Sequence, residues 1–324
     1  MIQLFKSGNP LKYPVLLCYV VVLKLPLLIH QIPSEIFHLN YVANYSASVI
    51  LLFVEALAMN TIVTNLRIAD HNNSSTALFV ILSGCALESF LPLSSVLLNN
   101  LLIVMLILIL YKTYNTNINY RLAFDAGLIV SIASFIYLPS SVLLIFIFIA
   151  LSFLRPFNWR EWFIAVIGFA VPFLLILCWA FLTDRFENVV SQHFQFIETN
   201  YPPQMDKNES RLALSIPVAV WGLLLLNSLY IIQRDYLKRI VQIRKFLVLN
   251  IWLLFILIIS VGAVWLIPGY ELFRVQHFLI IILPLSVLIA YSFDTIRRKL
   301  MAEVIHLFLL LLILFFQYQN QLLG

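Results

Sequence analysis

The residues best suited to chemistry lie close together in the segment PGYELFRVQHF. There Glu271, Arg274 and His277 follow one another at intervals of three residues, which places them on one face if the segment enters the next span as a helix. An arginine can hold a phosphate with two parallel hydrogen bonds, and a carboxylate can remove a proton from an acceptor. The spacing therefore predicts a substrate-binding set for a lipid phosphate. The alternative is a solvated rim at the membrane surface.

Two further carboxylates are expected at the same depth in the membrane as Glu271, Arg274 and His277. Glu35 lies in the first outside connection, near His38, and Glu88 lies at the outer end of the third apolar segment. We expect Glu35 and Glu88 to be catalytic, with Glu35 as the base, while Glu88 and His277 position the acceptor or a divalent ion. No cofactor and no dedicated metal centre is predicted, because the six histidines do not pair at helical spacing.

A second kind of candidate consists of charged residues inside apolar segments, where they are costly and are usually paired or functional. Lys24 lies about eight residues before the end of the first segment, and Glu55 about nine residues into the second, which gives them nearly equal depth on antiparallel helices. We expect a structural pair that neutralises both charges, with a proton or ion relay as the alternative. Arg121 and Asp125 are expected to form a pair at a helix end.

The composition implies that membrane helices position all of these residues. The 324-residue chain is 62% hydrophobic and 11% charged, whereas soluble domains carry about 25% charged residues. So few charges cannot cover a globular surface, which excludes soluble enzymes and nucleic-acid-binding proteins. The 26 phenylalanines and 14 tyrosines do not alternate between turns, which favours helices over an outer-membrane barrel. We therefore predict an all-α, polytopic transmembrane helical bundle.

A membrane helix needs about 20 mostly apolar residues, and the chain offers eleven such segments. The third and fourth segments, and likewise the fifth and sixth, are separated only by a short break that contains a proline. The segments are Tyr13–Ile32, Ser46–Asn65, Thr76–Leu93, Val96–Tyr111, Leu122–Leu138, Ser140–Leu154, Trp162–Thr183, Leu212–Ile232, Phe246–Ile267, Phe278–Phe293 and Ala302–Tyr318.

The basic residues predict the orientation of these spans. With the N-terminus inside, fifteen of the twenty Lys and Arg residues fall in inside connections, as the positive-inside rule requires. Lys24 lies within a span, and only Arg185, Lys207, Arg211 and Arg274 fall outside. We therefore expect one integral-membrane domain over residues 1–324, with the C-terminus outside and residues 184–211 as the longest outside loop. The connection RPFNWREW is interpreted as an aromatic and basic anchor at the membrane surface.

Familiar enzyme motifs do not add to this picture. The sequence contains no GxxxxGK[ST], GxGxxG, GxSxG or HExxH pattern. Its three cysteines, Cys18, Cys85 and Cys178, all lie inside apolar segments, which excludes a disulfide framework. Function must therefore be argued from the charged residues and from resemblance.

Two stretches carry a resemblance to a known family. They run from ESFLPLSSVLLNN to LYKTYN and from RLAFDAGLIV to GFAVPFLL, after the opening GNPLKYP. They resemble an uncharacterised family of multipass inner-membrane proteins of Bacteroidetes-type bacteria. The resemblance covers much of the first 180 residues, and it implies a multipass protein of the bacterial inner membrane.

The same stretches resemble, more distantly, the polyprenyl-phosphate-sugar-dependent multipass glycosyltransferases with the C-type fold. The matching pieces are Glu35, then LPLSSVLLNN, then AGLIVSIASFIYLP. In that family an acidic residue of the first outside loop acts as the base, which implies this role for Glu35. The family usually has an aspartate there, often beside a second acid, whereas this chain has a single glutamate.

Three functions follow as expectations. The first is a transferase that acts on a lipid-linked sugar or related donor at the outer face, with membrane lipid or a polyprenyl-phosphate-linked substrate as its partner and no nucleic acid. The second is a transporter or flippase, and the third is a non-catalytic assembly subunit. An outward cavity lined by Glu35, Glu88, Arg274 and His277 would favour the enzyme. A site in the middle of the membrane that includes Lys24 and Glu55 would favour transport.

Overall fold

The computed structural model describes residue 5 and residues 10–31, 39–69, 73–115, 119–184, 211–263, 275–296 and 299–323. These residues form eleven α-helices joined by short 3-10 helices, and the part of the chain so described contains no strand. The predicted all-α class is therefore confirmed.

Each apolar segment of the sequence overlaps one of these helices. A proline or a short polar stretch separates neighbouring helices, because proline lacks an N–H and cannot continue the hydrogen-bond ladder. The elements are α2 (Lys12–Gln31), α3 (Leu39–Asn65), α4 (Ser75–Gly84), η1 (Glu88–Phe90), α5 (Ser95–Lys112), η2 (Thr113–Asn115), α6 (Tyr120–Ile136), η3 (Leu138–Val142), α7 (Leu143–Leu154), α8 (Trp159–Leu182), α10 (Arg211–Asp235), η4 (Tyr236–Lys238), α11 (Val241–Ala263), η6 (Val275–Ile281), α12 (Ile282–Thr295) and α13 (Lys299–Leu323).

Seven helical segments of the described chain are long and apolar enough to cross a membrane, which makes the chain a multipass membrane protein by helix length and hydropathy. Two further helical segments, Ser75–Gly84 and Leu138–Leu154, are also apolar but shorter. The full count of eleven spans stays a prediction. The seven segments are Val42–Asn65, Ser95–Lys112, Trp159–Leu182, Ser215–Lys238, Val241–Gly262, Val275–Thr295 and Leu300–Gln317.

The helices belong to two compact units, which are described one at a time. Unit 1 comprises Met1–Leu93, Gln204–Leu247 and Ile282–Gly324, and unit 2 comprises Ser94–Pro203 and Val248–Ile281. The prediction of a single integral-membrane domain is not tested by this division.

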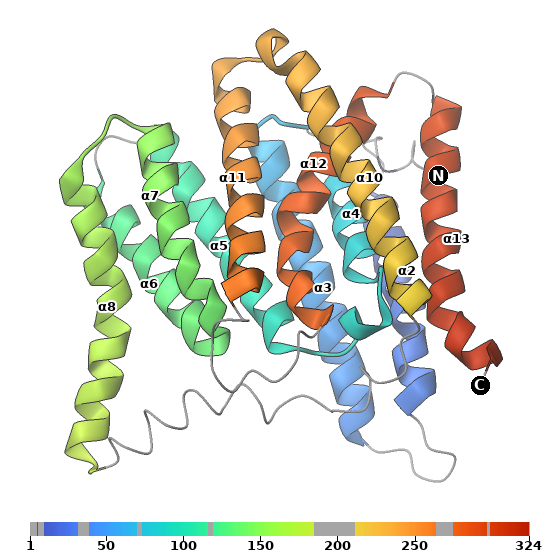
Figure 1. Ribbon diagram of the computed structural model, residues 1–324, viewed down its shortest axis with the longest axis horizontal. Helices are drawn as coiled ribbons and strands as arrows, with labels where there is room; N and C mark the ends of the chain where they lie inside the picture. Colours follow the sequence, from blue (N-terminus) through green and yellow to red (C-terminus); the bar gives the residue numbers. More distant parts are fainter. Residues whose placement is uncertain are drawn as a thin grey trace. The chain divides into compact units, whose positions relative to one another are not determined.

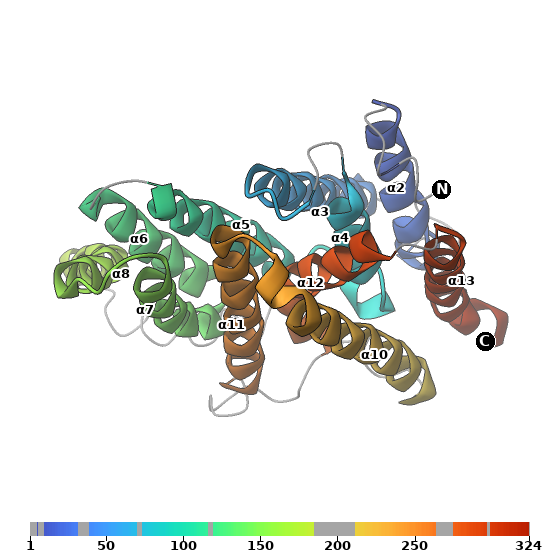
Figure 2. The ribbon, with the colours of Figure 1, turned by 90° about the horizontal axis from the view of Figure 1, so that it is seen from above.

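Helix α4 lies at the centre of unit 1. All ten of its residues are buried, and it contacts α2, α3, α12 and α13 (Figures 1 and 2). Its first turn is tied to the end of α12, where the Asn73 amide and the Ser75 hydroxyl donate to one oxygen of Asp294 at 2.6 and 3.1 Å. The helix ends at Gly84, and the following backbone stays buried without continuing the helix.

Unit 2 contains a close helix pair, α6 and α8 (Figure 1). Gly127 of α6 faces the carbonyl of Ala165, and Gly168 of α8 faces the carbonyl of Phe124, so closely that a Cβ at either position would overlap with the opposite backbone. Small residues at such crossings let two membrane helices approach. The side chains of Asn119 and Asn158 accept hydrogen bonds from the first turns of α6 and α8.

Candidate functional site

Most of the predicted outward cavity lies outside the described residues. Glu35, His38, Glu271 and Arg274 belong to that part of the chain. Glu88, the first residue of η1, belongs to unit 1, whereas His277 belongs to unit 2. The single cavity shared by these residues, with Glu35 and Glu88 as catalytic groups, therefore stays a prediction.

His277 lies in the interior of unit 2. It is buried in η6, and its Nδ1 lies 3.0 Å from the hydroxyl of Tyr137, with the two rings tilted at 5.6 Å between centroids. Two residues later, the carbonyl of Leu279 accepts a hydrogen bond from the Asn100 amide at 3.0 Å. The environment of His277 is thus a hydrogen-bonded helix interior, unlike the solvated rim that we considered as the alternative.

No cluster of three or more His, Cys, Asp or Glu side chains within the described ranges is arranged to hold a metal ion. The structure instead directs attention to a pair of buried charged residues in unit 1.

Lys24 and Glu55 are both completely buried in unit 1. The Lys24 ammonium donates to the carbonyl oxygens of Ser48 and Leu91, at 3.2 and 3.1 Å. Ser48 precedes Glu55 on α3 by two turns, about 10 Å of helix axis. The ammonium therefore binds backbone carbonyls of α3 and of the segment that follows α4.

The expected direct salt bridge between the two side chains is absent from the ion pairs of the described residues. Equal depth of two Cα atoms does not bring the charges together, because the long lysine side chain moves its charge away from its own Cα. Both carboxylate oxygens of Glu55 are buried, and neither has a hydrogen-bond partner among the residues that the structure describes. Glu55 is thus one of several exceptions to the rule that buried polar groups are satisfied, and both oxygens of its carboxyl group are affected.

The backbone beside this pair is a broken helix. Helix α4 has ten residues, about 15 Å of helix, which is half of a bilayer core of about 30 Å. Beyond it, buried side chains take up the carbonyls that the lost helix leaves free. Lys24 donates to Leu91, the residue before Pro92, and Gln317 of α13 donates to Cys85 at 2.6 Å. We call Lys24, Glu55 and this broken helix the buried polar site.

A short sequence repeat marks this break and could have located it. The letters LPLSSVLL at residues 91–98 return as LPSSVLL at residues 138–144, and in both places the proline lies between two α-helices. At the second break, within unit 2, the Ser260 hydroxyl donates to the Pro139 carbonyl at 2.7 Å. The prolines of both breaks were evident from the sequence, whereas the repeat around them had not been recognised.

Comparison with known proteins assigns no relative: no family model matches the chain, and no curated protein or solved structure matches it. The resemblances noted from the sequence thus stay expectations, and function has to be argued from the site itself.

Proposed function

We propose that this chain is a proton-coupled transporter or flippase of the bacterial inner membrane, with Glu55 as the proton-binding group. This is the second of the three functions that the sequence left open. The observation that carries the proposal is the Glu55 carboxyl group, whose two oxygens are buried in unit 1 without a hydrogen-bond partner in the described residues.

An unpartnered carboxyl group in a helix bundle is poorly suited to a structural role. An isolated buried charge costs many kcal/mol, and protein groups avoid the cost by binding a proton or an opposite charge. Structural pairs satisfy their members, as Arg155 and Glu161 do in unit 2 at 2.9 Å. Carboxyl groups that bind and release protons inside membranes are a recurrent feature of pumps and transporters.

The broken helix supports the same function. Transporters place their sites at interrupted helices, where unwound carbonyls and polar side chains can rearrange. Here Lys24 holds the Leu91 carbonyl at the break, and Lys24 and Glu55 are both fully buried in unit 1. Proton loss from Glu55 would leave a carboxylate that attracts the ammonium and weakens its hold on Leu91. A proton on Glu55 is thereby linked to the geometry of the break.

The other two functions fare less well. The lipid-linked transferase depends on Glu35, Glu271 and Arg274, which lie outside the described residues. A purely structural subunit would be expected to satisfy Glu55, which is not the case within the described residues.

Cysteine accessibility tests this proposal without knowledge of the substrate. In a chain whose native Cys18, Cys85 and Cys178 are replaced, Glu55→Cys is exposed to small membrane-impermeant thiol reagents from either side of oriented vesicles. A transporter alternates its access, so labelling from both sides is expected. The matched control is Val130→Cys, which is fully buried in unit 2 and should stay unlabelled.

Two outcomes would contradict the proposal. Labelling of Glu55→Cys from neither side would mean a sealed structural position. Labelling from the outer side alone, together with loss of cellular function in Glu35→Gln, would instead favour the transferase. Because the assay reads access rather than turnover, it separates these cases even when no substrate is known.

A further inference from the structure

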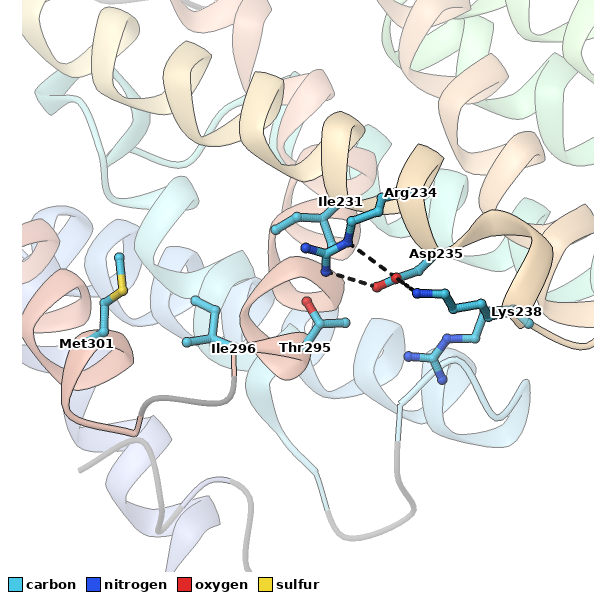
Figure 3. Close-up of a pocket in the computed structure, with 8 residues that line it drawn as sticks. Ile231, Arg234, Asp235, Lys238, Thr295, Ile296 and Met301 are labelled. Atoms are coloured by element: carbon cyan, nitrogen blue, oxygen red, sulfur yellow. Dashed lines mark hydrogen bonds and ion pairs between the residues drawn. The ribbon is translucent and has the colours of Figure 1, made fainter.

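A second feature of unit 1 is a charged pocket between the end of α10 and the junction of α12 with α13. It has a volume of about 820 Å³. Figure 3 shows Arg234 and Lys238 reaching toward Asp235, with the side chains of Ile296 and Met301 beyond Thr295. The lining residues are Ile231, Arg234, Asp235, Lys238, Arg239, Thr295, Ile296 and Met301.

The pocket carries more positive than negative charge. Asp235 accepts from Arg234 at 3.3 Å and from Lys238 at 3.4 Å, so one carboxylate is shared between two cations. The third cation, Arg239, donates from Nε to the Tyr291 hydroxyl at 3.0 Å, with its guanidinium over the Tyr291 ring. A guanidinium has five N–H donors, and no acceptor for the others is found among the described residues.

Tyr291 therefore fixes the Arg239 guanidinium, while most of its donors have no acceptor within the described part of the chain. A planar fork with unoccupied donors suits a phosphate, which accepts two parallel hydrogen bonds from it. Arg234 and Lys238 are exposed over 54% and 73% of their side chains. They can therefore turn from Asp235 toward an added anion at small cost.

The pocket lies where the polar headgroups of a membrane are expected. Three apolar segments have an end here: Ser215–Lys238 ends at the basic cluster, Val275–Thr295 ends at Thr295, and Leu300–Gln317 begins beside Met301. Apolar side chains thus adjoin the cations, since Met301 and Val304 are exposed. This juxtaposition fits a ligand with an anionic head and an apolar tail.

We infer that this pocket binds a phosphate group, presented by the headgroup of an anionic phospholipid or by a free phosphate compound. Basic pockets between membrane helices on the cytoplasmic side commonly bind anionic headgroups, and the positive-inside rule predicts that side for the α10–α11 connection. The inference does not depend on proton coupling at Glu55. Arg239 holds the phosphate, Tyr291 orients Arg239, and Asp235 keeps Arg234 and Lys238 in place until the anion arrives.

The competing interpretation is a basic rim that sets membrane orientation and binds nothing. The two interpretations predict different effects for Asp235→Asn. In an anion site, loss of the carboxylate releases Arg234 and Lys238 and strengthens phosphate binding. In a simple ion-pair cluster, the same change only removes two hydrogen bonds and creates no affinity for phosphate.

The experiment measures dissociation constants for the purified full-length chain in a neutral detergent. The probes are dioctanoyl phosphatidic acid, dioctanoyl phosphatidylcholine and inorganic phosphate. Arg239→Gln is expected to weaken phosphatidic acid binding about tenfold, whereas Asp235→Asn tightens it. The matched control is Arg121→Gln, which removes an exposed arginine paired with Asp125 at 3.7 Å in unit 2 and should leave binding unchanged.

The three probes identify the source of the phosphate. Binding of phosphatidic acid well above that of inorganic phosphate assigns the site to a lipid headgroup, and equal binding assigns it to a soluble phosphate compound. Either result supports the site. The thermal unfolding midpoint of each variant tests folding separately. Tyr291→Phe keeps every charge but removes the hydroxyl that orients Arg239, so it should weaken phosphatidic acid binding less than Arg239→Gln does. The inference is overturned if phosphatidylcholine binds as well as phosphatidic acid, or if Arg239→Gln and Arg121→Gln behave alike.

Discussion

The Lys24 ammonium lies 3.1 Å from the carbonyl oxygen of Leu91, the residue that precedes Pro92 in the irregular segment between α4 and α5. A second hydrogen bond, to Ser48 of α3, makes this one side chain a link between α2, α3 and the break. The charge in the middle of α2 thus holds irregular backbone in the interior of unit 1. Such backbone is tolerated at membrane depth only when other groups satisfy it.

Replacement of Lys24 should loosen this part of unit 1. Lys24→Met leaves the Ser48 and Leu91 carbonyls without their donor and Glu55 without its nearest cation, at a cost of about 3 kcal/mol or more. Buried Cys85 provides the readout: its reaction with a thiol reagent should become faster in a chain without Cys18 and Cys178. Lys238→Met, which alters an exposed lysine, serves as the control. Unchanged Cys85 reactivity in Lys24→Met would show that the two hydrogen bonds are dispensable.

The ion pair of Arg155 and Glu161 should contribute much more to the stability of the fold than surface ion pairs do. Only 9% and 3% of these side chains are exposed, and Arg155 Nε also donates to the Thr113 carbonyl at 2.6 Å. Arg155→Lys should lose the second contact, because lysine lacks the planar fork. We expect a cost of about 3 kcal/mol, measured by unfolding in mixed detergent micelles. Arg121→Lys, at the exposed pair, should change stability little, and equal effects at the two sites would contradict this account.

The contact of α6 with α8 gives a sharp test of packing. Gly127→Ala should force the helices apart, since the added methyl group would overlap with the Ala165 carbonyl. Overpacking of this kind costs about 1–3 kcal/mol. Gly222→Ala is the matched control, because a Cβ there meets nothing within 4 Å. This substitution also removes a flexible glycine from a helix. Thermal unfolding should show a lower midpoint for Gly127→Ala, whereas Gly222→Ala should not lower the midpoint.

The orientation of the chain can be tested by labelling. Single cysteines at Lys207 and Lys238 should react with impermeant reagents from the outside and from the inside respectively, as the distribution of basic residues predicts. Reaction of both positions from the same side would contradict the orientation, and with it the cytoplasmic placement of the Arg239 pocket.

Much of the fold was accessible from the sequence, because apolar length determines where a membrane helix can lie. The prolines at residues 92 and 139 marked both helix breaks, and the pairing of Arg121 with Asp125 was confirmed. The interpretation of RPFNWREW as a membrane anchor stays a prediction. Trp159 is exposed, but Arg155 and Glu161 turn inward toward each other.

The site was harder to predict, because it depends on side-chain reach and on contacts between distant helices. Lys24 and Glu55 were identified from the cost of charges in apolar segments, yet the carbonyl partners of Lys24 could not be inferred from depth alone. The Arg239 pocket was hidden among fifteen basic residues that orientation alone would explain. Nothing in the spacing indicated that Tyr291 would meet Arg239, 52 residues earlier in the chain.

The measurement that tests the central claim most directly is an infrared titration of the full-length chain in liposomes. A protonated carboxyl group has its own carbonyl stretching band. If Glu55 exchanges a proton, the wild-type chain should show such a band that fades as the pH rises, and the band should be missing in Glu55→Gln. Glu161→Gln alters another buried glutamate, one held in an ion pair, and should keep the band. A spectrum that does not change with pH, or that is the same in Glu55→Gln, would contradict a proton-coupled function.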